Sequence, residues 1–273
     1  MCGARKWIPD LGTLGRLETM QQTPVPYPYA PLPRKRQPVF EAGPMRRGDV
    51  VVLGTYLVLF VLGAGGLLAL VPGFVEAFKN QDSAQFGVNL IIYVVVFTGA
   101  IIMGFEALRS SFATFKYHPW AKALMVPGGW LGSLIVSAIV LVAMGNPVKS
   151  ENQLAIEGMT RSVPFATMFV VTVILGPFVE EYIFRHLLIG KLSRKLNVWV
   201  CVPISVVLFT SLHFIGSGSF DLTSAIPYTT LGIMMSLAYV VTGKSLAYSY
   251  VLHVFNNAVA LILSYTLLPL FQQ

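Results

Sequence analysis

The sequence predicts an all-α fold, a polytopic membrane helix bundle of about seven transmembrane helices. Of the 273 residues, 55% are hydrophobic and 11% are charged, whereas about a quarter of the residues in an ordinary soluble domain are charged. Mean hydropathy is correspondingly high, at +0.69. This composition excludes an ordinary soluble domain and is typical of an integral membrane protein.

Seven apolar runs are long enough to cross a hydrocarbon core of about 30 Å, which takes about 20 helical residues. The expected spans are 50–71, 86–105, 128–144, 164–189, 198–215, 225–242 and 246–268. The third run is rich in glycine, and the sixth is interrupted by Pro227 and Gly232. The expected count is therefore seven, give or take one.

Lysine and arginine residues gather in alternate loops, which predicts the orientation of the bundle. They are Arg34, Lys35, Arg36, Arg46 and Arg47 before the first span, Arg109, Lys116 and Lys122 after the second, Lys191, Arg194 and Lys195 after the fourth, and Lys244 after the sixth. The positive-inside rule places these loops and the amino terminus in the cytoplasm. The net charge of +7 mostly reflects this pattern, so it gives no reason to expect a nucleic-acid partner.

The chain is expected to contain a tail and one membrane domain. Residues 1–48 hold eight of the 17 prolines and a basic cluster, which predicts a disordered, Pro-rich cytoplasmic tail or, alternatively, a proline-motif ligand for a partner. Residues 49–273 form the membrane-embedded domain. Cys2 and Cys201 are too few to form a disulfide framework.

Three polar motifs interrupt the apolar runs of the second half. They are Glu180-Glu181-x-x-x-Arg185, Phe209-x-x-x-His213 and His253-x-x-x-Asn257. A charged side chain costs about 2.5 to 3.5 kcal/mol at the centre of a membrane helix on insertion scales, so such residues usually face a partner or a cavity. The motifs therefore predict a shared buried site.

The first motif separates two adjacent carboxylates. Because residues four apart share a helix face, Glu181 is expected to pair with Arg185, while Glu180 points about 100° away. A carboxylate left free in this way suits a general acid or base. If the pair only fixed packing, the second Glu would have no use. Pro177 is expected either to kink the helix and open space beside Glu180 or to serve packing alone.

The histidine motifs have both structural and chemical interpretations. A buried His such as His213 is more often a core residue than a catalytic one. His253 and Asn257 share one helix face, where two side-chain donors could hold a developing oxyanion; interhelical hydrogen bonding is the alternative. His186 is expected at a solvated or lipid-facing position.

In this order on successive helices, the three motifs resemble the CPBP family, which includes CAAX prenyl proteases of the Ras-converting type and bacterial bacteriocin-processing and self-immunity proteins. The resemblance covers residues 165–265 approximately. It implies a glutamate-dependent intramembrane endopeptidase that needs no cofactor. Members often have Gly after the Arg of the first motif, where this chain has His186, which bears on how closely helices approach there.

The resemblance also implies a role for each motif residue. Glu180 would activate a water, and His213 would orient and polarise it. His253 and Asn257 would stabilise the oxyanion. The supporting residues would be Glu181 and Arg185, which hold the geometry, and Phe209, which packs against the site.

Three other functions are compatible with parts of this pattern. In a metal hydrolase, His213, His253 and a Glu would be ligands, but His-Glu-x-x-His is absent and Arg185 and Asn257 would have no task, so no metal is expected. A non-catalytic immunity or partner-binding protein could use the same polar cluster. An ion-coupled transporter is disfavoured because no inverted repeat is found. The expected partners are membrane lipids and a membrane-associated or lipid-modified peptide or protein.

Overall fold

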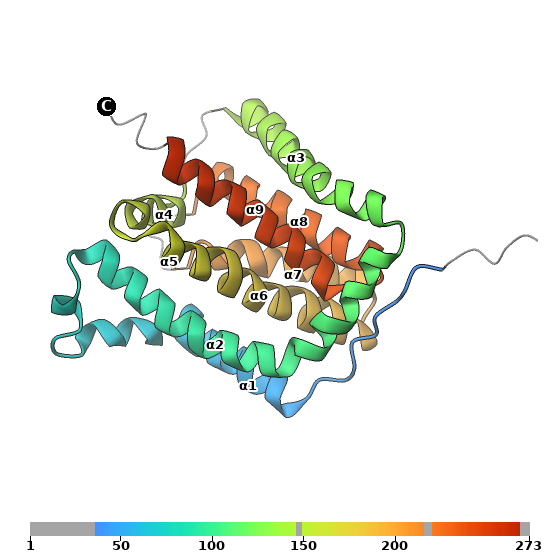
Figure 1. The fold of residues 1–273 in the computed structure, drawn as a ribbon, viewed down its shortest axis with the longest axis horizontal. Coiled ribbons are helices and arrows are strands. Elements are labelled where there is room, and N and C mark those ends of the chain that lie inside the picture. The colour runs from blue at the N-terminus through green and yellow to red at the C-terminus, as the bar shows by residue number, and fades with distance from the viewer. Residues whose placement is uncertain (1–35, 146–148, 216–219, 268–273) are drawn as a thin grey trace, which may run out of the picture. The chain divides into compact units, whose positions relative to one another are not determined.

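The computed structural model describes residues 36–145, 149–215 and 220–267, and regular structure in these ranges is entirely helical (Figure 1). The helices are α1 (Arg47–Tyr56), α2 (Gln81–Ser111), α3 (Pro119–Met144), α4 (Glu151–Ser162), α5 (Phe165–Phe169), α6 (Gly176–Glu180), α7 (Val198–Leu212), α8 (Leu222–Val241) and α9 (Leu246–Leu267). Shorter 3₁₀ segments are η2 (Ala64–Leu70), η3 (Val75–Ala77), η4 (Phe112–Lys116) and η7 (Leu192–Arg194), and π-helical segments are η1 (Leu57–Val61), η5 (Val170–Leu175) and η6 (Glu181–Lys191). Most of the expected tail, residues 1–35, lies outside the described ranges.

The membrane helix bundle is confirmed, but the count of seven spans is not. Within the described residues, five helices are long and apolar enough to span: Gln81–Lys116, Pro119–Met144, Phe165–Arg194, Leu222–Val241 and Leu246–Leu267. A sixth exists if Arg47–Val61 and Ala64–Leu70, which meet at 54°, form one broken span. Their bend follows Gly63, whose φ of 71° is left-handed, a conformation that glycine adopts without a steric penalty.

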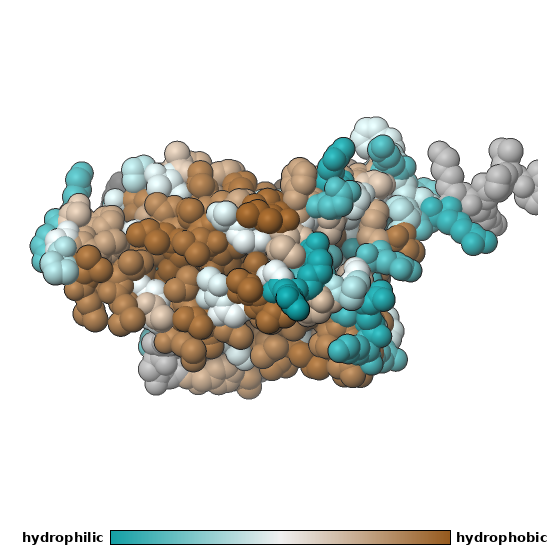
Figure 2. Space-filling model, turned by 90° about the horizontal axis from the view of Figure 1, so that it is seen from below, coloured by the Kyte–Doolittle hydropathy of each residue, from teal (hydrophilic) through white to brown (hydrophobic). Residues whose placement is uncertain are grey.

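The remaining expected span, 198–215, is short. Its helix α7 has 15 residues, about 22 Å at 1.5 Å per residue, which is less than a hydrocarbon core of about 30 Å. The outer surface nevertheless suits lipid. Figure 2 shows a face that is mostly hydrophobic, with hydrophilic side chains gathered toward its two ends.

The helix Phe165–Arg194, which runs through α5, η5, α6, η6 and η7, forms the centre of the bundle. In its most apolar stretch 67% of residues are buried, against 28% for the α2 span and 11% for α3. It packs against α2, α7 and α9, and it lies between α2 and α9 in Figure 1. The first motif is therefore enclosed on several sides, whereas α3 is mostly exposed to the surroundings.

Two glycines allow neighbouring helices to approach this central helix or the residues it contacts. A Cβ on Gly104 of α2 would lie 2.8 Å from the ring of Tyr182, and one on Gly232 of α8 would lie 3.1 Å from the ring of Phe209. Both rings are fully buried. The missing side chains thus make room for the aromatic residues beside the motifs.

Residues 37–46 form an extended segment that lies against the helices. The Phe40 amide donates to Gly243 O over 2.7 Å, and Gln37 Nε2 donates to Val241 O over 2.5 Å. Gly243 has a left-handed φ of 74° and packs directly against Pro38. The turn between α8 and α9 therefore holds this segment in place before α1 begins.

A buried ion pair fastens α1 to the far end of the central helix. Lys191 Nζ and the Tyr182 hydroxyl both donate to the carboxylate of Asp49. The side chains of Asp49 and Lys191 are 0% and 3% exposed. Because a buried charge is costly without its partner, each of these two residues depends on the other.

Asp49→Ala should lower the free energy of unfolding by about 3 to 5 kcal/mol, because it leaves Lys191 charged and buried without a partner. The measurement is an unfolding titration in mixed detergent micelles. Glu157→Ala is the matched control. It breaks the Lys149–Glu157 pair, in which Lys149 is 58% exposed, and an exposed pair contributes about 0 to 1 kcal/mol. Equal losses in the two variants would contradict a stabilising role for the buried pair.

Candidate active site

The central helix leaves the α-helical register before the first motif and again within it, from Glu181 onward. Segments η5 and η6 are π-helical and flank the single α-helical turn of α6. The Gly176 amide donates to Val171 O, five residues back, and Pro177 has no amide hydrogen to donate. Such π segments are frequent at functional sites. The irregular backbone expected from Pro177 is present, although the helix continues through it as one span.

One face of α9 docks onto this irregular stretch through three polar side chains. The Tyr250 hydroxyl donates to Ile174 O over 3.2 Å, and Asn257 Nδ2 donates to Thr172 O over 2.8 Å. Between them, His253 Nδ1 lies 3.0 Å from Glu181 Oε1. Residues spaced by three, four or seven positions share a helix face. Helix α9 is therefore held against the central helix by three side chains, and the bond between His253 and Glu181 joins the last motif to the first.

Glu181 and Arg185 form the predicted ion pair. Arg185 Nη1 lies 3.4 Å from Glu181 Oε1, and both side chains are 0% exposed. Arg185 Nη2 also donates to Gly232 O over 3.3 Å, and its guanidinium lies 4.5 Å from the centre of the Phe209 ring. A cation over an aromatic face is attracted to it. Phe209 thus contributes to the site by holding the arginine that neutralises Glu181.

Glu180 faces a different set of neighbours, as its position in the helix predicted. Its Oε2 lies 3.6 Å from His253 Nε2, which is too long for a hydrogen bond. Tyr93 on α2 and Tyr56 on α1 lie close enough to its carboxylate to interact with it electrostatically. The carboxylate is mostly buried, at 8% residue exposure. Glu180 therefore lies beside an imidazole nitrogen without being hydrogen-bonded to it.

Tyr93 and Tyr56 were not foreseen as site residues. The first half of the chain contains none of the three motifs, and a tyrosine in an apolar run is unremarkable as a sequence signal. Their proximity to Glu180 depends on how α1 and α2 pack against the central helix. The aromatic contact between Phe60 and Tyr93, at 4.8 Å between ring centres, helps to hold Tyr93 in that position.

His213 lies beside the carboxylate cluster on the far side of Phe209. Ring centres are 4.9 Å apart for Phe209 and His213, and 6.2 Å apart for Phe209 and His253. His213 Nδ1 lies 2.9 Å from Phe209 O, and the ring stacks on Tyr228 at 4.1 Å. With Nδ1–H donating to a carbonyl, Nε2 is left as an acceptor. Tyr228 is itself held by Ser150, 2.8 Å from its hydroxyl.

Five of the seven predicted site residues are thus in mutual contact, and the other two lie at the margin. The contacting residues are Glu180, Glu181, Arg185, Phe209 and His253. His213 contacts only Phe209 among them, and Asn257 lies one turn beyond His253. Across residues 36–145, 149–215 and 220–267, no three His, Cys, Asp or Glu side chains are arranged to hold a metal ion.

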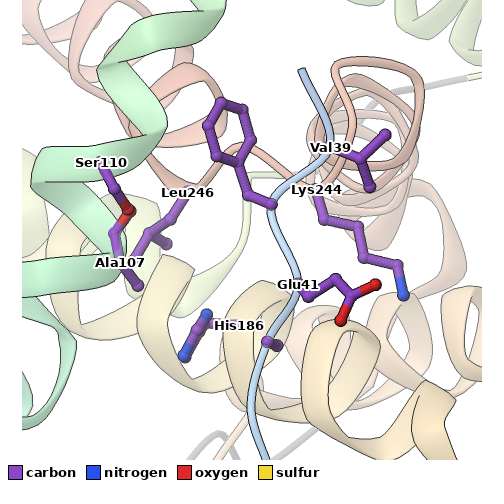
Figure 3. Close-up of a pocket in the computed structure, with 9 residues that line it drawn as sticks. Val39, Glu41, Ala107, Ser110, His186, Lys244 and Leu246 are labelled. Carbon is purple, nitrogen blue, oxygen red and sulfur yellow. The ribbon is translucent and has the colours of Figure 1, made fainter. Parts of the chain in front are cut away.

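The expectation for His186 was wrong. It is 6% exposed and stacks on Tyr182 with 5.7 Å between ring centres, so it is neither solvated nor lipid-facing. It lines a pocket of about 260 Å³ between the extended segment 37–46, α2 and the start of α9, together with Glu41 and Lys244 (Figure 3). None of the three-motif residues lines this pocket.

Arg185→Met should lower the free energy of unfolding by about 3 to 5 kcal/mol, because Glu181 then stays buried without its cation. The double variant Glu181→Gln/Arg185→Met should recover most of that loss, since the amide oxygen can still accept from His253. Unfolding titrations of both proteins and of Glu181→Gln alone give the coupling energy. Additive losses would contradict a direct dependence between the two charges.

Comparisons with known proteins agree with the motifs. Residues 162–259, which contain all three motifs, match the family described as Type II CAAX prenyl endopeptidase Rce1-like. An uncharacterized protein of Mycoplasma capricolum subsp. capricolum is 28% identical over 225 residues, which cover 76% of this chain and 64% of that protein. The membrane-embedded CAAX protease MroQ of Staphylococcus aureus is 24% identical over 188 residues, covering 64% of this chain and 72% of that protein.

A shorter stretch of 110 residues is 33% identical to the "Putative membrane peptidase YdiL" of Bacillus subtilis and covers 40% of this chain and 42% of that protein. No solved structure gives a significant match. The chain is an integral, multi-pass membrane protein. Its resemblance to the CAAX protease family is confirmed, and residues 162–259 are the part that matches the Rce1-like type II CAAX prenyl endopeptidases.

Proposed function

We propose that this chain is an intramembrane glutamate-dependent endopeptidase that cleaves a membrane-associated or lipid-modified peptide or protein. The single observation that supports this most is that two adjacent carboxylates have different partners. Glu181 is bound by Arg185 and His253, whereas Glu180 lies 3.6 Å from His253 Nε2 without a hydrogen bond to it. A buried carboxylate left in this state is suited to act as a general base.

In the proposed reaction, Glu180 removes a proton from a water molecule as its oxygen attacks the carbonyl carbon of the scissile peptide. The carbonyl oxygen becomes an oxyanion, which Asn257 stabilises by donating a side-chain N–H. His253 donates to it through Nε2–H as an imidazolium, because its Nδ1–H is held by Glu181. Collapse of the tetrahedral intermediate breaks the C–N bond, and the proton held by Glu180 passes to the leaving amine. One water is consumed for each peptide bond, and the carboxylate is regenerated.

The remaining residues support this chemistry. Arg185 keeps Glu181 ionised, so that Glu181 can accept from His253 Nδ1 and hold the ring with Nε2 toward Glu180. His213, whose Nδ1 is bonded to Phe209 O, orients and polarises the water through Nε2. Tyr93 lies near the Glu180 carboxylate and contributes to its electrostatic surroundings.

The proposed substrate class rests on the comparisons with known proteins. The proposed orientation in the membrane rests on the distribution of Lys and Arg. The matching family is one of CAAX prenyl endopeptidases, and MroQ is a CAAX protease, which favours a substrate with a lipid-modified terminus. Clusters of Lys and Arg predict that the amino terminus is in the cytoplasm, and on that basis we expect the substrate to be recruited from the cytoplasmic leaflet.

Glu180→Gln should abolish cleavage while preserving the fold, because the amide has nearly the same shape but cannot take a proton. General-base catalysis contributes about 10²- to 10⁴-fold, and the turnover number should fall by about that factor. The assay uses the full chain in liposomes with internally quenched peptides, some farnesylated at a CAAX terminus and some unmodified. In ¹⁸O-labelled water, the new carboxyl terminus should gain one labelled oxygen.

Glu76→Gln is the matched control, since it changes an exposed carboxylate on η3 in the same way. Full cleavage by Glu180→Gln at equal protein abundance would refute the role of Glu180. A folded wild-type protein that cleaves none of the peptides would overturn the proposal in favour of a non-catalytic immunity or partner-binding protein.

A further inference from the structure

The carbonyl oxygen of Thr172 has no backbone N–H donor in the central helix. In the π register of η5, the Gly176 amide donates to Val171 O rather than to Thr172 O. The next residue, five positions after Thr172, is Pro177, which has no amide hydrogen. An unpaired carbonyl inside a membrane protein requires another donor. That donor is the side chain of Asn257, at 2.8 Å.

The same contact restricts the amide group of Asn257. One Nδ2 hydrogen goes to Thr172 O, and Oδ1 accepts from Asn256 Nδ2 over 2.9 Å. A side-chain amide is planar and offers two N–H donors. With two of its bonds set by the protein, the plane of the group is fixed, and one N–H remains for a ligand.

We propose that Pro177 is a positioning residue that acts through Asn257: by lacking an N–H in a π-helical stretch, it leaves the Thr172 carbonyl free to orient the Asn257 amide. This inference rests on the proposed function, in which the remaining N–H of Asn257 meets the oxyanion. An interior proline normally weakens a helix, and this task accounts for its presence three residues before Glu180.

Packing alone does not account for the arrangement. Pro177 is buried, and an alanine there would also be apolar. Alanine would, however, restore an N–H within reach of Thr172 O or Val173 O, the fifth and fourth residues back. That amide would compete with Asn257 for the carbonyl. Proline differs from every other apolar residue in this property.

The geometric part is tested by solid-state NMR on the full chain in lipid, with ¹³C at threonine carbonyls and ¹⁵N at asparagine side chains. An N–H···O bond brings the two labelled nuclei within about 4 Å, so dipolar dephasing is expected in the wild type and is assigned by its loss in Asn257→Asp. Pro177→Ala should lose the same signal. A wild type without it, or a Pro177→Ala protein that retains it, would overturn the proposal.

Pro127→Ala is the matched control, since it adds an N–H to an exposed interior position of α3, away from the site, and should retain the signal. On a peptide that the wild type cleaves, Pro177→Ala should lower the turnover number about tenfold, the range of one lost hydrogen bond, with KM unchanged and thermal stability equal or higher.

The two claims fail in different ways. An unchanged turnover number in Pro177→Ala, or a rise in KM alone, would refute the positioning role while leaving an active wild type as a peptidase. A wild type that cleaves nothing would remove the proposed function, and the NMR signal in Pro177→Ala would still decide whether proline frees the carbonyl for Asn257.

Discussion

The hydrogen bond between His253 and Glu181 connects α9 to the central helix, and the site depends on both. It exists because Arg185 neutralises Glu181 inside the bundle, and Arg185 is in turn held by Gly232 O and the Phe209 ring. Removing either Glu181 or Arg185 would leave the other charge unpaired in an apolar core, where it is most expensive. The same cluster therefore joins the central helix, α8 and α9, and determines which carboxylate remains available.

Backbone irregularity adds a second constraint that regular helices could not satisfy. An α-helix closes its own carbonyls and offers a neighbour only side chains. In the π-helical η5, Thr172 O and Ile174 O accept from Asn257 and Tyr250 of α9. Main-chain oxygens thus anchor a neighbouring helix with little freedom, because a backbone atom cannot change rotamer. The π-helical backbone of the central helix thus helps to fix the position of α9.

The sequence was sufficient for the all-α membrane fold and for the Glu181–Arg185 pair, because apolar runs and i,i+4 spacing are local signals. Its count of seven spans is not confirmed, since hydropathy does not show that the first run bends after Gly63 or that α7 ends at Leu212. Tyr93, and the burial of His186, depend on packing between helices distant in sequence. No local pattern distinguishes a tyrosine that contacts Glu180 from one that faces lipid.

The pairing of Asp49 with Lys191 has a consequence for how the protein is made. The partners are 142 residues apart, and synthesis at about 5 to 20 residues per second separates their appearance by about 7 to 28 s. During that interval Arg46 is the only one of the two cationic partners of Asp49 in the described residues that has been made, because Lys191 has not yet emerged from the ribosome. The first helix therefore reaches its final position only after the fourth apolar run has been inserted, so assembly of the bundle follows an order different from that of translation.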